Sequence, residues 1–567
     1  TSQYIDITMD TVADTVEEIG QAGALVESSV EGGKVTLKLD TTKMDAPVSI
    51  KLTEKELEIV TGEDIQLVKG NSVQILTPEN FSGEVVWNVK FLKYDGTFLR
   101  NSGYQKIKRE LKEGEVDGTR TAGDADGSHL LELRTVPSGV VLTGKNKGTV
   151  VVTATDSTGQ QKRWNVEILY EDPANLPAVT SEDFEKIRQT WRESLIGSNL
   201  EAEAGGPEIL ENLNKEAEEI WNSYAYKGQD TCAGIPWPQQ EGEAGNPDTP
   251  DEDDAVEFRP AFKNVLAMAK AYAAEGGKLY QDPALLSDMI NILDYLCTAC
   301  YAPKSQTDNW WTWEIGLPKD LIPALMLIYD DLTQEQVMRY TEALYFFQPD
   351  PFHEGVINTA STHGQGYRTA QGANIIDCST TAVGLGALRE DNELVYIGMQ
   401  ASSGTFVINT VKDSSLIAKE GYASGFYPDG SYLDHSSVPY LGAYGIEFMK
   451  GAVKIPSLLA GTPWQYPAEV QQNLESYVVD GFGNGIYNGM LLDSLKGRSV
   501  SRPASSNQAA GREAMTIILQ LVDSFTEPAK STTLSALKLW LQKDPGFVDS
   551  LSGAEYVAVK QKAKEIL

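Results

Sequence analysis

Hydrophobic and polar residues alternate with a period of two along roughly the first 170 residues of the chain. This period places successive side chains on opposite faces of a strand, so it predicts β-strands with one buried face. The alternation is clearest in segments 34–39, 84–89, 149–154 and 163–168. Clusters of Gly, Asp and Ser separate these segments, and their spacing predicts a β-sandwich.

The hydrophobic period changes to about 3.6 near segment 173–177, Pro-Ala-Asn-Leu-Pro, which we interpret as a linker. Segment 180–183, Thr-Ser-Glu-Asp, has the form of a capping box and predicts the start of a helix. The apolar face of this helix is predicted to contain Phe184, Ile187, Trp191 and Leu195.

The same pattern predicts two further helices. One ends at Gly276-Gly277, where a positive φ angle costs little. Its apolar stripe is Phe262, Val265, Ala269 and Tyr272. The other begins with the capping box at 333–336, Thr-Gln-Glu-Gln. Its apolar stripe is Val337, Tyr340 and Leu344.

Helical segments with short Gly, Pro and Asp breaks continue to the end of the chain, which is typical of an α/α toroid surrounding a cleft. We therefore expect a multidomain protein with a β-rich segment at 1–51, a β-sandwich at 52–172 and an all-α (α/α) toroid at 173–567. The sandwich resembles a bacterial immunoglobulin-like module, and this resemblance implies that Val86-Trp87 lies on an inner strand. The Gly-rich segment 481–485 is interpreted as a turn. The acidic segment 241–254 lacks the ligand spacing of a calcium loop and is interpreted as a solvated loop.

Composition limits the classes of partner. The chain has a net charge of −34 and no basic stripe that could bind a nucleic acid. No apolar run is long enough to cross a membrane. An acidic polysaccharide is not excluded, because a few arginines in one cleft can bind it locally. The cysteines lack the partner motif that a zinc site requires, so we expect them to be buried or incidental. They are Cys232, Cys297, Cys300 and Cys378.

Several common catalytic signatures are absent from the sequence, including GxSxG, HExxH, the phosphate-binding loop and the dinucleotide fingerprint. The chain has four histidines. His129 lies in the β-region, whereas His353 and His363 lie in a polar stretch. His435 lies in a dense polar and aromatic segment and is the strongest candidate for chemistry.

The segment around His435 runs from Gly425 to Gly445 and reads GFYPDGSYLDHSSVPYLGAYG. It resembles the signature of polysaccharide lyase family 8, the hyaluronate, chondroitin AC and xanthan lyases. Three other segments match the same family in the same order. They are Asn309-Trp-Trp-Thr-Trp-Glu-Ile-Gly316, Gly372-Ala-Asn374-Ile-Ile-Asp377 and Gly497-Arg498-Ser-Val-Ser-Arg502. The resemblance covers about residues 180 to 567 and implies a polysaccharide lyase.

The resemblance implies a role for each residue in β-elimination at C5 of a uronate. Asn374 would neutralise the substrate carboxylate by donating a hydrogen bond, as in an oxyanion hole. His435 would assist this or act as the base. Tyr444 would donate a proton to the leaving O4 and, in some proposals, also act as the base. Arg498 would supply the cation that a phenolic base needs, and Arg502 would bind sugar carboxylates or sulfates.

Aromatic residues in the first matching segment offer faces for sugar rings. We expect Asn309, Trp310 and Trp311 to bind substrate and Trp313 to be in the core. Glu314 is expected to bind polar groups of the sugar. Tyr432 and Tyr440 are expected to be structural.

Family members continue into a large antiparallel β-region that forms one wall of the cleft, and this sequence ends before such a region. A non-catalytic glycan-binding fragment is therefore an alternative, with that β-region missing or supplied by a separate chain. A toroid glycoside hydrolase, which uses two carboxylates, and an adhesin acting through the β-sandwich are two more.

The motifs leave the polymer open among hyaluronan, chondroitin and xanthan. Ala504 stands where, among family members, xanthan-specific enzymes carry Tyr, which favours a glycosaminoglycan. No metal or other cofactor is expected, because Asn374 takes the neutralising role. The start Thr-Ser-Gln, without a signal peptide, fits a trimmed bacterial protein that is secreted or held at the cell surface.

Overall fold

The computed structural model of the protein describes most of the chain. The described residues are 4–567 except the following: 11–12, 20–22, 32–33, 45–47, 55–56, 91–126, 198, 204, 224–253, 298–300, 302–309, 357–366, 411–422 and 436. Several predictions fall outside the described residues, and they concern Asn309, His363, Cys232, Cys300 and most of segment 241–254.

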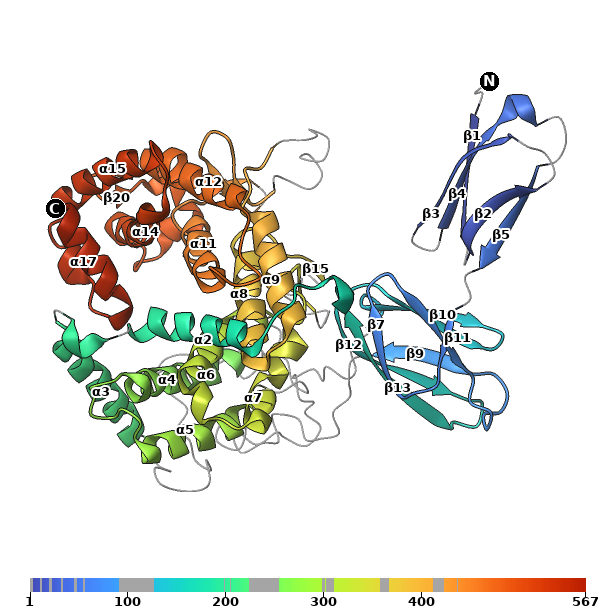
Figure 1. Ribbon diagram of the computed structural model, residues 1–567, viewed down its shortest axis with the longest axis horizontal. Coiled ribbons are helices and arrows are strands. Elements are labelled where there is room, and N and C mark those ends of the chain that lie inside the picture. The colour runs from blue at the N-terminus through green and yellow to red at the C-terminus, as the bar shows by residue number, and fades with distance from the viewer. Residues whose placement is uncertain are drawn as a thin grey trace.

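The N-terminal strands form two small sheets, which Figure 1 shows apart from the rest of the chain. Strands β1 (Tyr4–Asp10), β4 (Lys34–Asp40) and β3 (Leu25–Glu31) pair in that order, and β2 (Ala13–Ile19) pairs with β5 (Ser49–Glu54). The predicted strand at 34–39 is thus β4, whose Val35, Leu37 and Leu39 are buried. Strand β5 runs across the expected boundary at residue 51.

A β-sandwich follows, as predicted. One described sheet has the order β10-β11-β8-β6 and the other β7-β13-β12-β9. The strands are β6 (Glu58–Val60), β7 (Asp64–Val68), β8 (Ser72–Leu76), β9 (Val86–Lys90), β10 (Leu131–Val136), β11 (Gly139–Gly144), β12 (Gly148–Thr155) and β13 (Gln161–Leu169). The prediction of an inner strand at Val86-Trp87 is wrong for the described sheet, because β9 lies at its edge and Val86 is 55% exposed. Trp87 still faces inward, with its ring centroid 5.4 Å from that of Trp164.

The remaining described residues are mostly helical. The helices are α2 (Ser181–Ile196), α3 (Gly206–Ser223), α4 (Asp254–Ala273), α5 (Pro283–Tyr295), α6 (Leu317–Ile328), α7 (Gln334–Phe347), α8 (Gly372–Arg389), α9 (Asn392–Thr405), α11 (Tyr444–Leu459), α12 (Ala468–Ser476), α13 (Gly483–Gly485), α14 (Asn507–Leu521), α15 (Ala529–Lys543), α16 (Phe547–Ser550) and α17 (Val557–Ile566). Helices α4, α6, α8, α11 and α14 pack successively around an open ring, and α17 returns towards α2 and α3 (Figure 1). This arrangement confirms the predicted toroid.

Local sequence signals explain where these helices start. The backbone N–H of Thr180 donates to the Asp183 carboxylate at 2.8 Å and caps α2, while that of Thr333 donates to Gln336 at 2.8 Å and caps α7. The three predicted apolar stripes face the core, although Leu195 is only half-buried. The predicted helix starts are therefore confirmed.

The interpretation of segment 481–485 as a turn is wrong. Residues 477–482 form a π-helical turn that continues directly into α13. Phe482 is buried, and a Cβ atom at Gly481 would lie 3.0 Å from the carbonyl oxygen of Gly430. Here glycine permits close packing of two backbone segments, so it does not terminate the helix.

The sandwich packs directly on the helical region. Lys147, at the start of the β12 hairpin, is fully buried and forms an ion pair with Glu393 of α9. The same Glu393 carboxylate accepts hydrogen bonds from the backbone N–H groups of Tyr170 and Glu171 at 2.6 and 2.8 Å. Burial alone would lower the pKa of Lys147, but electrostatic interactions with Tyr345 and with the Glu393 carboxylate raise it, so the lysine is charged.

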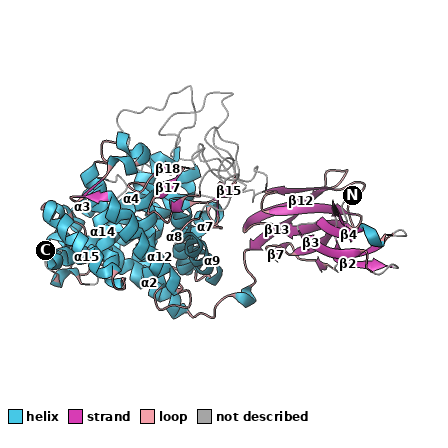
Figure 2. Cartoon of the chain, turned by 90° about the horizontal axis from the view of Figure 1, so that it is seen from above, coloured by secondary structure: helices cyan, strands magenta, loops and turns pink. Residues whose placement is uncertain are grey.

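Short strands insert between the helices on one side of the toroid. They are β14 (His353–Glu354), β15 (Arg368–Thr369), β16 (Gly425–Phe426), β17 (Tyr432–Asp434), β18 (Val438–Pro439), β19 (Ile486–Tyr487) and β20 (Met490–Leu491). Figure 2 shows β15, β17 and β18 on the same side of the helical region. No described helix is long and apolar enough to cross a membrane.

Candidate active site

Asn374 is the third residue of α8 and is half-buried. Its Nδ2 atom donates a hydrogen bond to Oε2 of Glu354 at 3.0 Å. Its backbone N–H donates to the carbonyl oxygen of Gln371 at 3.1 Å, which forms the first turn of the helix. The side chain is therefore held at a helix start, where the backbone is well fixed.

Gly372 brings the start of α8 against strand β17. Its φ angle is +54°, and a Cβ atom there would lie 2.6 Å from Oδ2 of Asp434 and 2.8 Å from the Cβ atom of Ser424. Only glycine fits both the conformation and the space. The glycine two residues before Asn374 thus contacts the residue immediately before His435.

His435 has a left-handed backbone conformation, with φ +49°. Such angles are uncommon outside glycine and cluster at functional sites. The Nδ1 atom lies 2.9 Å from Oδ1 of Asp434, and the side chain is 43% exposed. Asp434 itself is buried, and its Oδ2 accepts a hydrogen bond from the Tyr432 hydroxyl at 3.1 Å. The imidazole is therefore oriented by a buried carboxylate and remains accessible.

Tyr444, the first residue of α11, lies beside His435, with 4.8 Å between the ring centroids. Nη2 of Arg498 donates to the Tyr444 hydroxyl at 3.2 Å. Burial raises the pKa of the phenol, and Arg498 offsets only part of this rise. The expected cation is thus adjacent, but the net effect keeps the phenol protonated at neutral pH.

Arg498 and Arg502 lie in and directly after a short 3-10 helix, Gly497–Ser501. Gly497 has φ +51°, and a Cβ atom there would lie 2.6 Å from the ring of Tyr440. The buried Tyr440 hydroxyl accepts a hydrogen bond from the Arg498 backbone N–H at 3.3 Å. Arg502 is exposed, and its side chain makes no polar contact with the described residues. Tyr432 and Tyr440 are structural, as expected.

The tryptophans differ in burial, and Trp313 lies in the core as expected. Trp313 is fully buried, with its ring centroid 5.0 Å from that of Phe347. Trp310 and Trp311 are half-buried, and each carries a guanidinium over its ring. Arg368 lies 4.7 Å from the centroid of Trp310, and Arg259 lies 5.3 Å from that of Trp311.

The expectation for Glu314 is wrong. This carboxyl group is completely buried and accepts hydrogen bonds from the backbone N–H groups of Gly355 and Val356 at 2.9 and 3.1 Å. Burial raises its pKa to about 8. Glu314 fixes a loop in the interior and cannot bind polar groups of a sugar.

Two residues next to Asn374 were not predicted. Glu354 is 5% exposed and bridges Asn374 and Arg368, whose Nη2 lies 2.7 Å from its Oε1. Burial raises the pKa of Glu354, while Arg368 and Asn374 lower it. These residues lie on two paired strands, β14 and β15, of two residues each. Strands this short leave no periodic pattern in the sequence, so only the contact with Asn374 identifies these residues.

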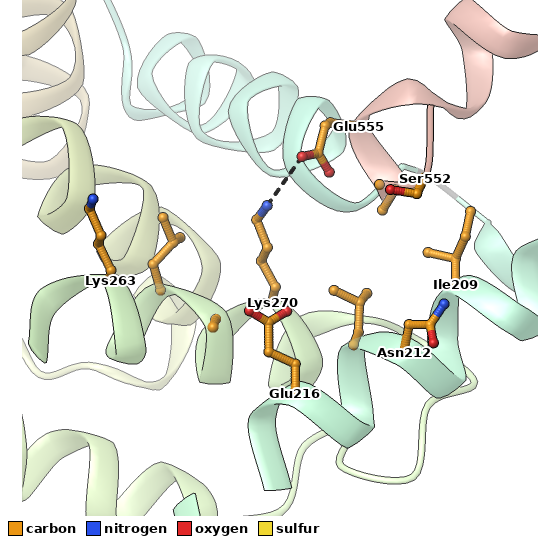
Figure 3. Close-up of a pocket in the computed structure, with 12 residues that line it drawn as sticks. Ile209, Asn212, Glu216, Lys263, Lys270, Ser552 and Glu555 are labelled. Carbon is orange, nitrogen blue, oxygen red and sulfur yellow. Dashed lines mark ion pairs between the residues drawn. The ribbon is translucent and has the colours of Figure 1, made fainter. Parts of the chain in front are cut away.

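Other chemistry is sparse in the described part of the chain. It contains no group of three or more His, Cys, Asp or Glu side chains arranged to hold a metal. Cys297 and Cys378 are buried and unpaired, as expected. A pocket of about 460 Å³ lies where the end of the chain meets α3 and α4, and Lys270 forms an ion pair with Glu555 there at 3.6 Å (Figure 3). No predicted site residue lines it.

Comparisons with known proteins identify related sequences and structures. The chain is 28% identical to a hyaluronate lyase of Enterococcus faecalis over 398 residues. The aligned residues cover 69% of this chain and 37% of the relative. It is 30% identical over 244 residues to a hyaluronate lyase of Staphylococcus aureus, covering 43% of this chain and 29% of the relative. This chain thus spans well under half the length of these relatives.

Solved structures show the same fold. The chondroitin AC lyase of Streptomyces coelicolor superposes with a TM-score of 0.55 at 24% identity, over 68% of this chain and 49% of that one. A Paenibacillus xanthan lyase gives a TM-score of 0.53 at 24% identity, over 68% and 33%. The profile of the family described as "Polysaccharide lyase family 8, N terminal alpha-helical domain" matches residues 191–538, more than half of the chain. The chain therefore belongs to polysaccharide lyase family 8.

Proposed function

We propose that this chain supplies the helical part of a lyase that cleaves a uronic-acid polymer by β-elimination and leaves a 4,5-unsaturated uronate. One observation supports this most strongly. Arg498, Tyr444, His435 and Asp434 form a continuous series of contacts. Through Gly372, that series reaches the start of the helix that carries Asn374. The named relatives are hyaluronate and xanthan lyases, which agrees with this proposal.

The first chemical requirement is to make the C5 proton removable. An ionised carboxylate beside C5 opposes carbanion formation, because negative charge develops next to existing charge. A hydrogen bond from the second N–H of Asn374 to that carboxylate would stabilise the enolate-like transition state. A neutral amide suits this role, since it donates without losing a proton.

The second requirement is a base and an acid on the same site. We propose His435 as the base, because the contact of its Nδ1 with Asp434 favours the tautomer with a lone pair on Nε2. We propose Tyr444 as the acid that protonates the leaving O4, because burial keeps its phenol protonated. Arg498 would stabilise the phenolate that forms when the proton leaves.

Substrate binding would use the groups around this centre. Trp310 and Trp311 would stack against sugar rings, Asn309 would bind their polar groups, and Arg502 would pair with a carboxylate or sulfate. We propose a glycosaminoglycan as the polymer, because Ala504 is small and hyaluronate lyases are among the most similar relatives. The protein would then act outside the cell, where such polymers occur.

We also propose that the chain has three domains, with the first boundary after β5 at residue 54 and the second near residue 172. Limited proteolysis tests the first boundary. Cleavage within β5 before any cleavage at 55–57 would contradict it.

The decisive experiment incubates the protein with hyaluronan, chondroitin sulfate or pyruvylated xanthan, with chelator present, and follows the ultraviolet absorbance of the unsaturated uronate. Tyr444→Phe removes the proposed acid. Tyr280→Phe is a matched control, because Tyr280 lies between α4 and α5 and is 38% exposed. Absorbance that grows with wild type and the control, but not with Tyr444→Phe, supports the proposal. Polymer binding without absorbance would instead support a glycan-binding fragment.

A further inference from the structure

The hairpin of strands β14 and β15 places two charged residues opposite each other. His353 pairs with Thr369, and Glu354 pairs with Arg368. The two carboxylate oxygens of Glu354 have different partners, since Oε1 receives Arg368 at 2.7 Å and Oε2 receives Asn374 at 3.0 Å. Glu354 is therefore a bridge between a fixed guanidinium and the amide of the candidate active site.

The orientation of Asn374 matters for the proposed chemistry. A primary amide has a donor and an acceptor of nearly equal size, and a half-turn about χ2 exchanges them. One orientation offers an N–H to a substrate carboxylate, whereas the other offers a carbonyl oxygen, which repels it. A carboxylate can only accept from the amide, so Glu354 selects the orientation in which Nδ2 faces it.

Contacts with both the toroid and the sandwich hold the hairpin in place, so the position of Glu354 is fixed. On the toroid side, the backbone N–H groups of Gly355 and Val356 donate to the buried Glu314. On the sandwich side, Nε2 of His129 lies 2.7 Å from the carbonyl oxygen of Val356. The ring of Tyr367, next to Arg368, contacts His129 with 4.5 Å between centroids.

The guanidinium of Arg368 also lies 4.7 Å from the ring centroid of Trp310. The polar series from Trp310 through Arg368 and Glu354 therefore ends at Asn374. A displacement of this hairpin would therefore change the orientation of the Asn374 amide, although Glu354 and Arg368 themselves are not proposed to contact the reacting atoms.

We propose that Glu354 is a positioning residue that holds the Asn374 amide with its donor available to the substrate carboxylate. This inference rests on the proposed function. It assigns Glu354 no contact with the substrate, so its whole contribution passes through Asn374.

A double-mutant cycle tests this directly. Glu354→Leu is expected to lower kcat by about 10- to 100-fold, within the range of coupling between residues in contact, with KM changed much less. In the Asn374→Ala background the same change should have no further effect on kcat, because the side chain that Glu354 orients is absent. Glu219→Gln, on the exposed face of α3, is the matched control and should leave kcat unchanged.

A second variant covers the case in which Glu354→Leu does not fold. Glu354→Gln keeps the shape of the side chain, and any loss of kcat that it causes should also vanish in the Asn374→Ala background. Equal losses in both backgrounds overturn the inference, because Glu354 would then act independently of Asn374. A wild-type protein that cleaves none of the three polymers overturns the proposed function and this inference with it.

Discussion

Oδ1 of Asp434 lies 2.9 Å from Nδ1 of His435 and also accepts a hydrogen bond from the His435 backbone N–H at 2.8 Å. A carboxylate can only accept, so Nδ1 carries a proton, and in the neutral imidazole the lone pair is then on Nε2. His435 makes both contacts from a left-handed backbone conformation. Asp434 thus fixes both the tautomer and the direction of the imidazole.

Asp434→Asn should lower kcat/KM by about 10²-fold, the lower range of what a general base contributes. The asparagine can present an N–H to Nδ1 and so favour the wrong tautomer. The rate is measured from the absorbance of the unsaturated product. Asp549→Asn is the control, because the Asp549 side chain on α16 is exposed. An unchanged kcat/KM in Asp434→Asn would show that the tautomer of His435 does not limit the reaction.

Arg498→Met should shift the alkaline limb of the kcat profile to higher pH. The guanidinium favours the phenolate of Tyr444, so its removal raises the pKa of the phenol further. Because the proposed acid must hold its proton, activity should persist to higher pH in the variant, although kcat itself falls. A shift to lower pH would contradict the assignment of Tyr444 as the acid.

Trp310→Ala and Trp313→Ala should separate binding from folding. Trp310 is half-buried beside Arg368, so its loss should raise KM with little change in Tm. Trp313 is completely buried against Phe347, and its loss should cost about 3–5 kcal/mol of stability. Thermal melting and steady-state kinetics on the same samples distinguish the two, and a large Tm loss in Trp310→Ala would contradict the substrate-facing assignment.

Stability should fall as the pH rises towards 8, partly because of Glu314. Burial raises its folded-state pKa to about 8, whereas an unfolded glutamate titrates near 4.3. The folded state therefore holds this proton more tightly, and that contribution is full below about pH 4.3 and is lost as the pH rises through 8. Glu314→Gln should show a weaker decline of Tm across this window. An identical pH dependence in both proteins would mean that Glu314 is ionised in the folded protein.

The sequence predicted elements well where one periodic pattern sufficed. Strand β12 and helix α2 follow from alternation and from a capping box, because both signals are local. The roles of Asn374, His435 and Tyr444 came from the family resemblance, and the structure brings their segments together through Gly372 and Asp434.

The failures have physical causes that lie outside any local pattern. Glu314 follows a row of tryptophans in the sequence, but the π-helical turn at 312–316 directs it inward onto the Gly355 loop. Glu354 escaped notice because its importance depends on a contact with Asn374, twenty positions away. The glycines at 481–485 were interpreted as a break, although Gly481 packs closely against the distant Gly430.

The buried pair of Lys147 and Glu393 gives the β-sandwich a significance beyond that of a spacer. Lys147→Met within the intact fold would leave the Glu393 carboxylate buried without its lysine. An uncompensated buried charge of this kind costs about 3–5 kcal/mol. We therefore expect the sandwich and the toroid to unfold in one cooperative melting transition, and an exchange of either module would also require replacing the residues on the other side of this interface.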